Sequence, residues 1–135
     1  MESAPKLSTP EQELAYLREQ VTRKEAELAL GGADERVRII SEQIHAHAAA
    51  PAEVLAPAYR MSEAVTTGTA DNILAELNLG GSEQAIKSLQ QTMEEKGIKN
   101  ALSVLEKLHD PHVADDFHRY LVRYVAAGLM DPGYD

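Results

Sequence analysis

The chain has 135 residues and a net charge of −9, because 22 Asp and Glu residues outnumber 13 Lys and Arg residues. This length accommodates one ordinary domain, or a small domain with an appended helical arm. The acidic residues are spread evenly along the chain, so we expect no basic face that would bind nucleic acid or an anionic membrane directly. The absence of cysteine excludes disulfide bonds and thiol chemistry.

Hydrophobic residues make up 44% of the sequence, but the chain has one Phe and no Trp, and much of this fraction is Ala. Because β-branched and aromatic residues are sparse, the composition favours packed helices over a β-sandwich. We therefore predict an all-α fold, with an N-terminal helical arm or hairpin followed by a compact helical bundle. No apolar run approaches the roughly 20 residues of a membrane span, and no signal peptide is evident. We expect a cytoplasmic protein without direct membrane insertion.

Residues 1–8 are polar and unpatterned, and we expect a disordered lead there. A helical arm or hairpin is predicted over residues 9–50, because Thr9 can cap a helix and Pro10 fits its first position. A narrow heptad stripe in the first helix predicts pairing with another helix, either in this chain or in a second copy. The alternative is a solvated helix packed loosely on its own domain. The predicted interaction residues of the stripe are Leu14, Leu17, Val21 and Leu28.

A double glycine at positions 31–32 ends this helix, and a second helix is predicted from Asp34. The double glycine allows either a helical hairpin or a flexible joint, and we favour the hairpin because it would bury both apolar stripes against each other. His45 and His47 lie two positions apart, so they point to different sides of the helix and we interpret both as surface residues. The apolar stripe of this second helix is formed by Val37, Ile40 and Ile44.

Residues 51–70 are the predicted Pro-containing linker, because Pro51 and Pro57 disfavour helix in the residues before them. The segment is more apolar than a free linker needs, so an extended strap on the helical core is the alternative. A helical turn that begins at Ser62 is expected to end by Gly68. The larger apolar residues of the segment are Val54, Leu55, Tyr59 and Met61.

A compact helical bundle is predicted over residues 71–128, followed by a polar tail at 129–135. Gly97 is placed as the glycine that follows a helix C-terminus. The pair Asp110-Pro111 is typical of a helix start, with a capping residue followed by proline at the first helical position. The last helix has a wide apolar face at helical spacing, formed by Val113, Phe117, Tyr120, Leu121, Tyr124 and Val125.

Histidines and aspartates gather at the start of the last helix, in HDPHVADDFH. His112 and Asp116 are four residues apart on one helical face, and His109 precedes the turn, so a metal-dependent regulator or hydrolase is the alternative function. We favour a structural interpretation, because negative side chains in the first turns of a helix are stabilised by its dipole. We therefore predict no metal and no cofactor.

The last helix also offers a surface for a protein partner. Arg119 and Arg123 repeat the four-residue spacing of Tyr120 and Tyr124, and an exposed Arg-Tyr ladder suits a protein interface. Periodicity favours the alternative, in which the tyrosines are core residues whose hydroxyls reach solvent. Arg119 and Arg123 are the interaction residues predicted here. Catalysis is not expected, because Walker and nucleophile-elbow motifs are both absent.

The run GIKNALSVLEKLHDPHVADDFHRYLVRYVAAG, residues 97–128, resembles a segment near the N-terminus of large bacterial proteins. Those proteins look like ATPases or coupling factors of type IV secretion (conjugation) systems. The preceding APAEVLAPAYRMS resembles the linker before that segment, and a charged N-terminal helix is common to both, so the resemblance covers about residues 10–128. It implies a helical accessory module that precedes the motor, either standing alone or as part of a longer protein. No ATPase residue is carried over, since the Walker motif is missing.

Together these observations predict a non-catalytic protein–protein interaction or assembly module. The resemblance implies an accessory part of a type IV secretion apparatus. The expected partner is another protein or a second copy, bound through the N-terminal helix.

Overall fold

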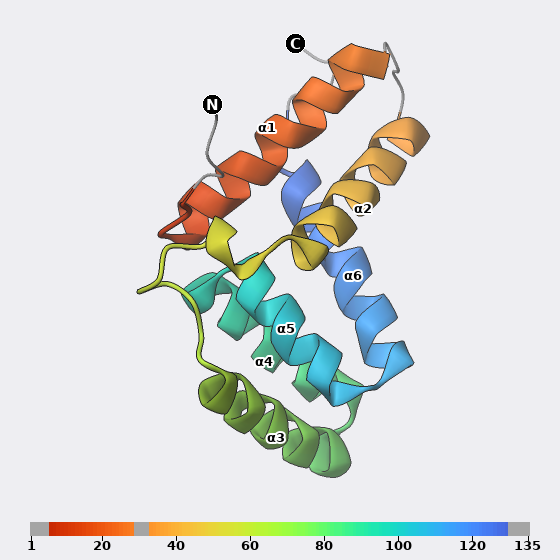
Figure 1. Ribbon diagram of the computed structural model, residues 1–135. Helices are drawn as coiled ribbons and strands as arrows, with labels where there is room; N and C mark the ends of the chain where they lie inside the picture. The colour runs from red at the N-terminus through yellow and green to blue at the C-terminus, as the bar shows by residue number, and fades with distance from the viewer. Residues whose placement is uncertain (1–5, 29–32, 130–135) are drawn as a thin grey trace.

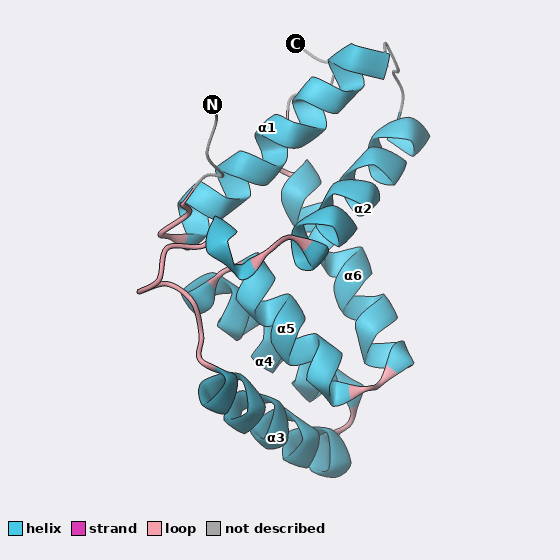
Figure 2. Cartoon of the chain, in the orientation of Figure 1, coloured by secondary structure: helices cyan, strands magenta, loops and turns pink. Residues whose placement is uncertain are grey.

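The structure is a computed structural model in which residues 6–28 and 33–129 are described (Figure 1). The described part consists of helices joined by loops and contains no named strand (Figure 2), so the all-α prediction is confirmed. No helix in these two ranges is long and apolar enough to cross a membrane. The elements are α1 (Pro10–Leu28), α2 (Ala33–Ala49), the 3-10 helix η1 (Ala52–Val54), α3 (Glu63–Gly80), α4 (Ser82–Lys96), α5 (Ile98–Leu108) and α6 (Pro111–Ala126).

The helices α1 and α2 lie side by side as a hairpin, with α6 running along α2 (Figure 1). Near the C-terminal end of α1 and the N-terminal end of α2, the Arg36 guanidinium donates two hydrogen bonds to the Glu25 carboxylate, with Nε 2.7 Å from Oε2. At the opposite end of the molecule, α3 packs on α4 and α5. The turn between α1 and α2, at residues 29–32, lies outside the described residues, as do residues 1–5 and 130–135.

A single hydrophobic core runs through the hairpin and the later helices. Leu17 of α1 and Ile40 of α2 belong to the same buried cluster as Leu89 of α4, Val104 of α5 and Phe117 of α6. The predicted separation of an arm at 9–50 from a bundle at 71–128 is therefore wrong for the core. Each fully buried Leu, Ile or Phe contributes about 1.5–3 kcal/mol of hydrophobic stabilisation, so the hairpin and the later helices stabilise each other through this shared core.

The heptad stripe of α1 is not a free interaction surface. Leu17 and Val21 are 1% and 0% exposed, and Leu14 packs against the same core. Of the four predicted residues only Leu28 is exposed, at 43%. Of the two pairings that the stripe allowed, the structure shows the one within this chain, because α2, α4, α5 and α6 cover α1. Leu17 and Val21 are therefore not available to bind another protein or a second copy. On α2, Ile39 is buried in place of the predicted Val37, which is half exposed.

The predicted linker is short, because α3 begins at Glu63 and passes through Gly68 without a break. The Ser62 hydroxyl caps this helix by accepting from the Val65 amide at 3.1 Å. A glycine inside a helix costs only about 1 kcal/mol, and burial of residues on the inner face of α3, such as Ile73, outweighs that cost. The expected helix end at Gly68 is therefore wrong.

The segment before α3 is a strap that covers the start of α1. Leu7 and Leu55 form an isolated parallel bridge, with both hydrogen bonds at 2.8 Å. The side chains of Leu7, Val54 and Leu55 are buried together in a small second cluster, against which Tyr16 and Tyr59 pack. The strap alternative for residues 51–62 therefore describes the structure better than a free linker, and Leu7 is not part of a disordered lead.

Candidate functional site

A groove of about 890 Å³ lies between α2, α5 and α6. The groove exists because α5 packs mainly on α3 and α4 and only lightly on α2 and α6. Its floor is apolar, and small alanines on α2 and α6 keep it open. The residues that make the floor and walls are Ile44, Ala48, Ala49, Leu102, Leu105 and Ala114.

Two stacked histidines stand at one side of the groove. The rings of His45 on α2 and His118 on α6 are 4.6 Å apart and nearly parallel. The Nε2 atom of His118 lies 2.8 Å from the Ser41 hydroxyl. Burial, together with the neighbouring His45, lowers the pKa of His118, while Asp115 acts in the opposite direction. His45 is exposed, as predicted for a surface residue, and His118 is partly buried.

Three carboxylates also line the groove, those of Glu106, Asp110 and Asp115. Asp110 caps α6, since its Oδ1 accepts from the His112 and Val113 amides at 3.0 and 3.1 Å. Asp115 accepts a hydrogen bond from Arg119. Glu106 on α5 is exposed, and among the described residues it has no ion-pair or side-chain hydrogen-bond partner.

The three residues of the alternative metal site, His109, His112 and Asp116, do not converge on one point. His112 Nε2 lies 3.5 Å from Asp116 Oδ2 on the exposed side of α6. His109 instead ends α5 in a left-handed conformation, with φ 51° and ψ 39°, and lines the groove. Within residues 6–28 and 33–129, no group of three or more His, Asp or Glu side chains could hold a metal ion.

The predicted interaction residues of α6 are exposed, but the tyrosines beside them are not an open ladder. Arg119 pairs with Asp115 and Asp116 of its own helix, and Arg123 is exposed. The Tyr120 ring stacks between Phe117 and Tyr124, with 5.9 Å between successive ring centres. Burial, with a smaller contribution from Glu94, raises the pKa of Tyr120. This helix therefore fits the core interpretation of its tyrosines.

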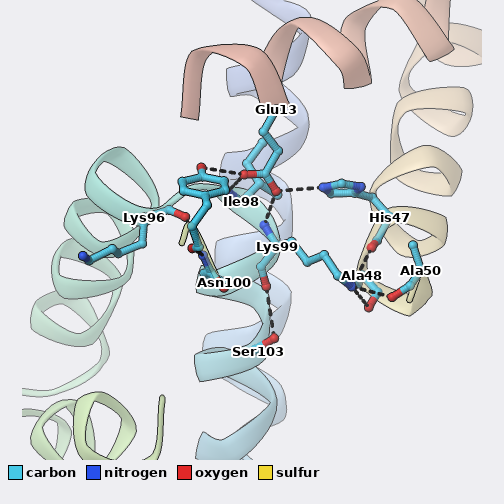
Figure 3. A network of polar contacts seen from close by, with 10 residues as sticks. Glu13, His47, Ala48, Ala50, Lys96, Ile98, Lys99, Asn100 and Ser103 are labelled. Carbon is cyan, nitrogen blue, oxygen red and sulfur yellow. Dashed lines mark hydrogen bonds and ion pairs between the residues drawn. The ribbon is translucent and has the colours of Figure 1, made fainter. Parts of the chain in front are cut away.

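A second polar site lies inside the protein and was missed in the sequence (Figure 3). The Glu13 side chain is 0% exposed and points from α1 at the start of α5. Its Oε1 accepts from the Ile98 amide at 3.0 Å and the Tyr59 hydroxyl at 2.9 Å. Its Oε2 accepts from the Lys99 amide at 2.6 Å and from His47 at 2.7 Å. Glu13 thus occupies the place of a bound anion at a helix N-terminus.

Lys99 completes this network on the side of α2. Its ammonium group donates to the carbonyl oxygens of His47, Ala48 and Ala50, at 2.7–3.1 Å, and so caps the C-terminal end of that helix (Figure 3). Burial lowers the pKa of Lys99, and the charge of Glu13 opposes that shift. His47 is 4% exposed, so its interpretation as a surface residue is wrong.

The network closely surrounds Gly97. This residue has φ 92°, and a Cβ atom there would collide with the Tyr59 hydroxyl and the Glu13 carboxylate. Burial, followed by the charge of Glu13, raises the pKa of Tyr59, so its hydroxyl keeps the proton it donates. Every donor of this site already has an acceptor within the chain, and we interpret it as structural.

One signal for Glu13 was present in the sequence. Glu13, Leu17 and Val21 are spaced four residues apart, so the carboxylate lies on the same helical face as two core residues. The histidine pair had no such signal, because His45 and His118 are distant in sequence.

The sequence matches no protein-family model, and neither curated proteins nor solved structures give a match.

Proposed function

We propose that this chain is a non-catalytic protein-interaction module that binds an amphipathic helix of a partner protein in the groove of α2, α5 and α6. The observation that carries the proposal is the groove itself, with a volume of about 890 Å³ and an apolar floor. Partner helices commonly bind by laying an apolar face into a hydrophobic groove of this kind. Exposed residues such as Ala49 and Ser103 line it, so a partner can reach the floor without unfolding the bundle.

The polar groups near the groove support binding better than chemistry. A hydroxyl hydrogen-bonded to an imidazole, as in Ser41 and His118, is the beginning of a nucleophilic site. Such a site also needs a third group that orients the base and a pocket that presents the nucleophile to a substrate. Among the described residues no side chain hydrogen-bonds the second ring nitrogen of His118, and Ser41 does not line the groove.

The biological setting belongs to the same proposal. The resemblance of residues 97–128 supports an accessory role in a bacterial type IV secretion apparatus, acting in the cytoplasm. The groove is built largely from this segment, through α5 and α6. The stripe of α1 does not support self-association, because Leu17 and Val21 are buried within the chain. Flanking genes without any conjugation component would count against the secretion setting.

The test is to map where a model helix binds. A peptide of about 15 residues, long enough for roughly four helical turns, carries leucines on one face and glutamines on the other. We expect it to shift the amide NMR signals of groove residues in α2, α5 and α6. The variant Ala49→Trp fills the groove and should abolish these shifts.

Ala46→Trp is the matched control for this experiment, because Ala46 is an exposed alanine of α2 outside the groove. It should leave the peptide-induced shifts intact. The proposal fails if the peptide causes no shifts, if the shifts lie elsewhere, or if Ala49→Trp does not remove them.

A further inference from the structure

We infer that the partner helix is basic, with Lys or Arg residues flanking its apolar face and approaching Glu106 on α5 and Asp115 on α6. This inference rests on the proposed function, because it names the chemistry of the segment that the same groove receives. It is carried by the charges around the groove, all of which belong to described residues.

Apart from its three histidines, the ionisable side chains that line the groove are all acidic. Three carboxylates line it, those of Glu106, Asp110 and Asp115, and no Lys or Arg does. Charge complementarity across an interface favours the matching partner and disfavours a like-charged one. The apolar floor with an acidic edge is therefore complementary to a helix with an apolar face and basic flanks.

The position of Glu106 makes it the best candidate for a direct contact. It lies on the last turns of α5, where the partial negative charge of the helix C-terminus also favours a cation. Glu106 is exposed, and it has no ion-pair or side-chain hydrogen-bond partner elsewhere in residues 6–28 and 33–129. A partner Lys or Arg can therefore pair with it without displacing an existing contact.

The acids on α6 play different parts. Asp110 Oδ1 already accepts hydrogen bonds from the first amides of α6, so Asp110 contributes its negative charge but this oxygen is less available to a partner cation. Asp115 pairs with Arg119 on an exposed surface, where such pairs contribute less than about 1 kcal/mol. An incoming cation can share Asp115 with Arg119 at little cost, and the same position would repel an acidic helix.

The experiment compares three peptides that differ in the polar face alone. Each has the leucine face described above, with Lys, Gln or Glu at the remaining positions, and calorimetry gives the dissociation constants. We expect the Lys peptide to bind about three- to tenfold more tightly than the Gln peptide, as one or two exposed ion pairs allow. The Glu peptide should bind most weakly, and about 0.5 M salt should reduce the differences.

A matched pair of variants separates local pairing from the net charge of the chain. Glu106→Gln should reduce the preference for Lys over Gln by about threefold. Glu83→Gln removes the same charge from an exposed site on α4, which contributes nothing to the groove, and should leave the preference unchanged.

The outcomes distinguish this inference from the function on which it rests. Equal binding of all three peptides, blocked by Ala49→Trp, would keep the interaction groove and overturn its basic partner. A preference for Lys that Glu83→Gln reduces as much as Glu106→Gln does would also overturn it, because net charge would then be the cause. If no peptide binds, both the inference and the proposed function fail.

Discussion

Replacing Glu13 by glutamine is the most direct test of the buried network. One carboxylate oxygen accepts from the Ile98 amide and the Tyr59 hydroxyl. The other accepts from the Lys99 amide and from His47. A glutamine of similar size keeps one oxygen and replaces the other by an NH₂ group, which cannot accept. Whichever way the amide is turned, one backbone N–H at the start of α5 is then buried without a partner.

The expected loss follows from that unsatisfied group. A buried donor without a partner costs about 1–3 kcal/mol, and hydrogen bonds to a charged acceptor are stronger than neutral ones, so Glu13→Gln should lower the free energy of unfolding by about 2–4 kcal/mol. Glu13→Ala leaves both amides without an acceptor and creates a cavity, so we expect a loss of about 4 kcal/mol or more. A domain of this kind has a total stability of about 5–15 kcal/mol.

Urea unfolding followed by circular dichroism measures this loss. The control is Glu11→Gln, the same substitution at an exposed position two residues away on α1. It removes the same charge and should change the stability by less than about 1 kcal/mol. Hydrogen exchange adds a local readout, since the amides of Ile98 and Lys99 should exchange faster in Glu13→Gln. If Glu13→Gln and Glu11→Gln unfold at the same urea concentration, Glu13 does not cap α5.

Two further predictions follow from Gly97 and His118. Gly97→Ala should destabilise the protein by more than the roughly 1–3 kcal/mol of backbone strain at this positive φ, because the new Cβ collides with the buried network. Gly81→Ala is the control, with a similar φ of 84° and nothing within 4 Å; equal losses in urea unfolding would refute the collision. Burial lowers the pKa of His118 in the folded state, so the unfolded chain binds a proton at this residue more readily than the folded protein does. As the pH falls below about 6.5, protonation of His118 therefore favours unfolding and lowers the stability of the protein. The melting temperature should therefore fall less steeply between about pH 7 and pH 5 in His118→Asn than in the wild type; equal slopes would contradict this.

The sequence predicted those parts of the fold that depend on local chemistry. Gly97 ends α4 with a positive φ, and Asp110 caps α6 immediately before Pro111, as the residue types indicate. Proline at the first helical position and a capping side chain act within a few residues, so neighbouring residues suffice to identify them. The prediction of a helix end at Gly68 failed because local chemistry did not decide the conformation there. Packing of α3 on distant helices keeps Gly68 helical.

The function of the α1 stripe could not be read from its pattern. Leu17 and Val21 have the same spacing whether the surface that covers them belongs to this chain or to another. Tertiary packing decided the question, and it buried both residues in the core. The groove was beyond sequence analysis for a related reason, because it is a gap left between α2, α5 and α6 and no motif encodes a gap.

Some of the charged side chains in the described part of the chain cap the ends of distant helices, and these contacts explain why α1 is not a detached arm. A helix leaves its first amides and last carbonyls without internal partners, and here distant charged side chains supply several of them. Glu13 caps the start of α5, and Lys99 caps the end of α2. Arg18 caps the end of α6, where it donates to the carbonyl oxygens of Val125 and Tyr124 at 3.0 and 3.1 Å.

These capping contacts fasten the hairpin to the later helices at three points, in addition to the shared core. The carboxylate of Glu106 is different, since it caps no helix end and has no ion-pair partner among the described residues. A charge with no part in folding is free to be selected for binding, and Glu106 lines the apolar groove between α2, α5 and α6. The buried charges of Glu13 and Lys99 thus serve to hold the fold together, and a basic partner helix would give the exposed carboxylate of Glu106 a binding partner.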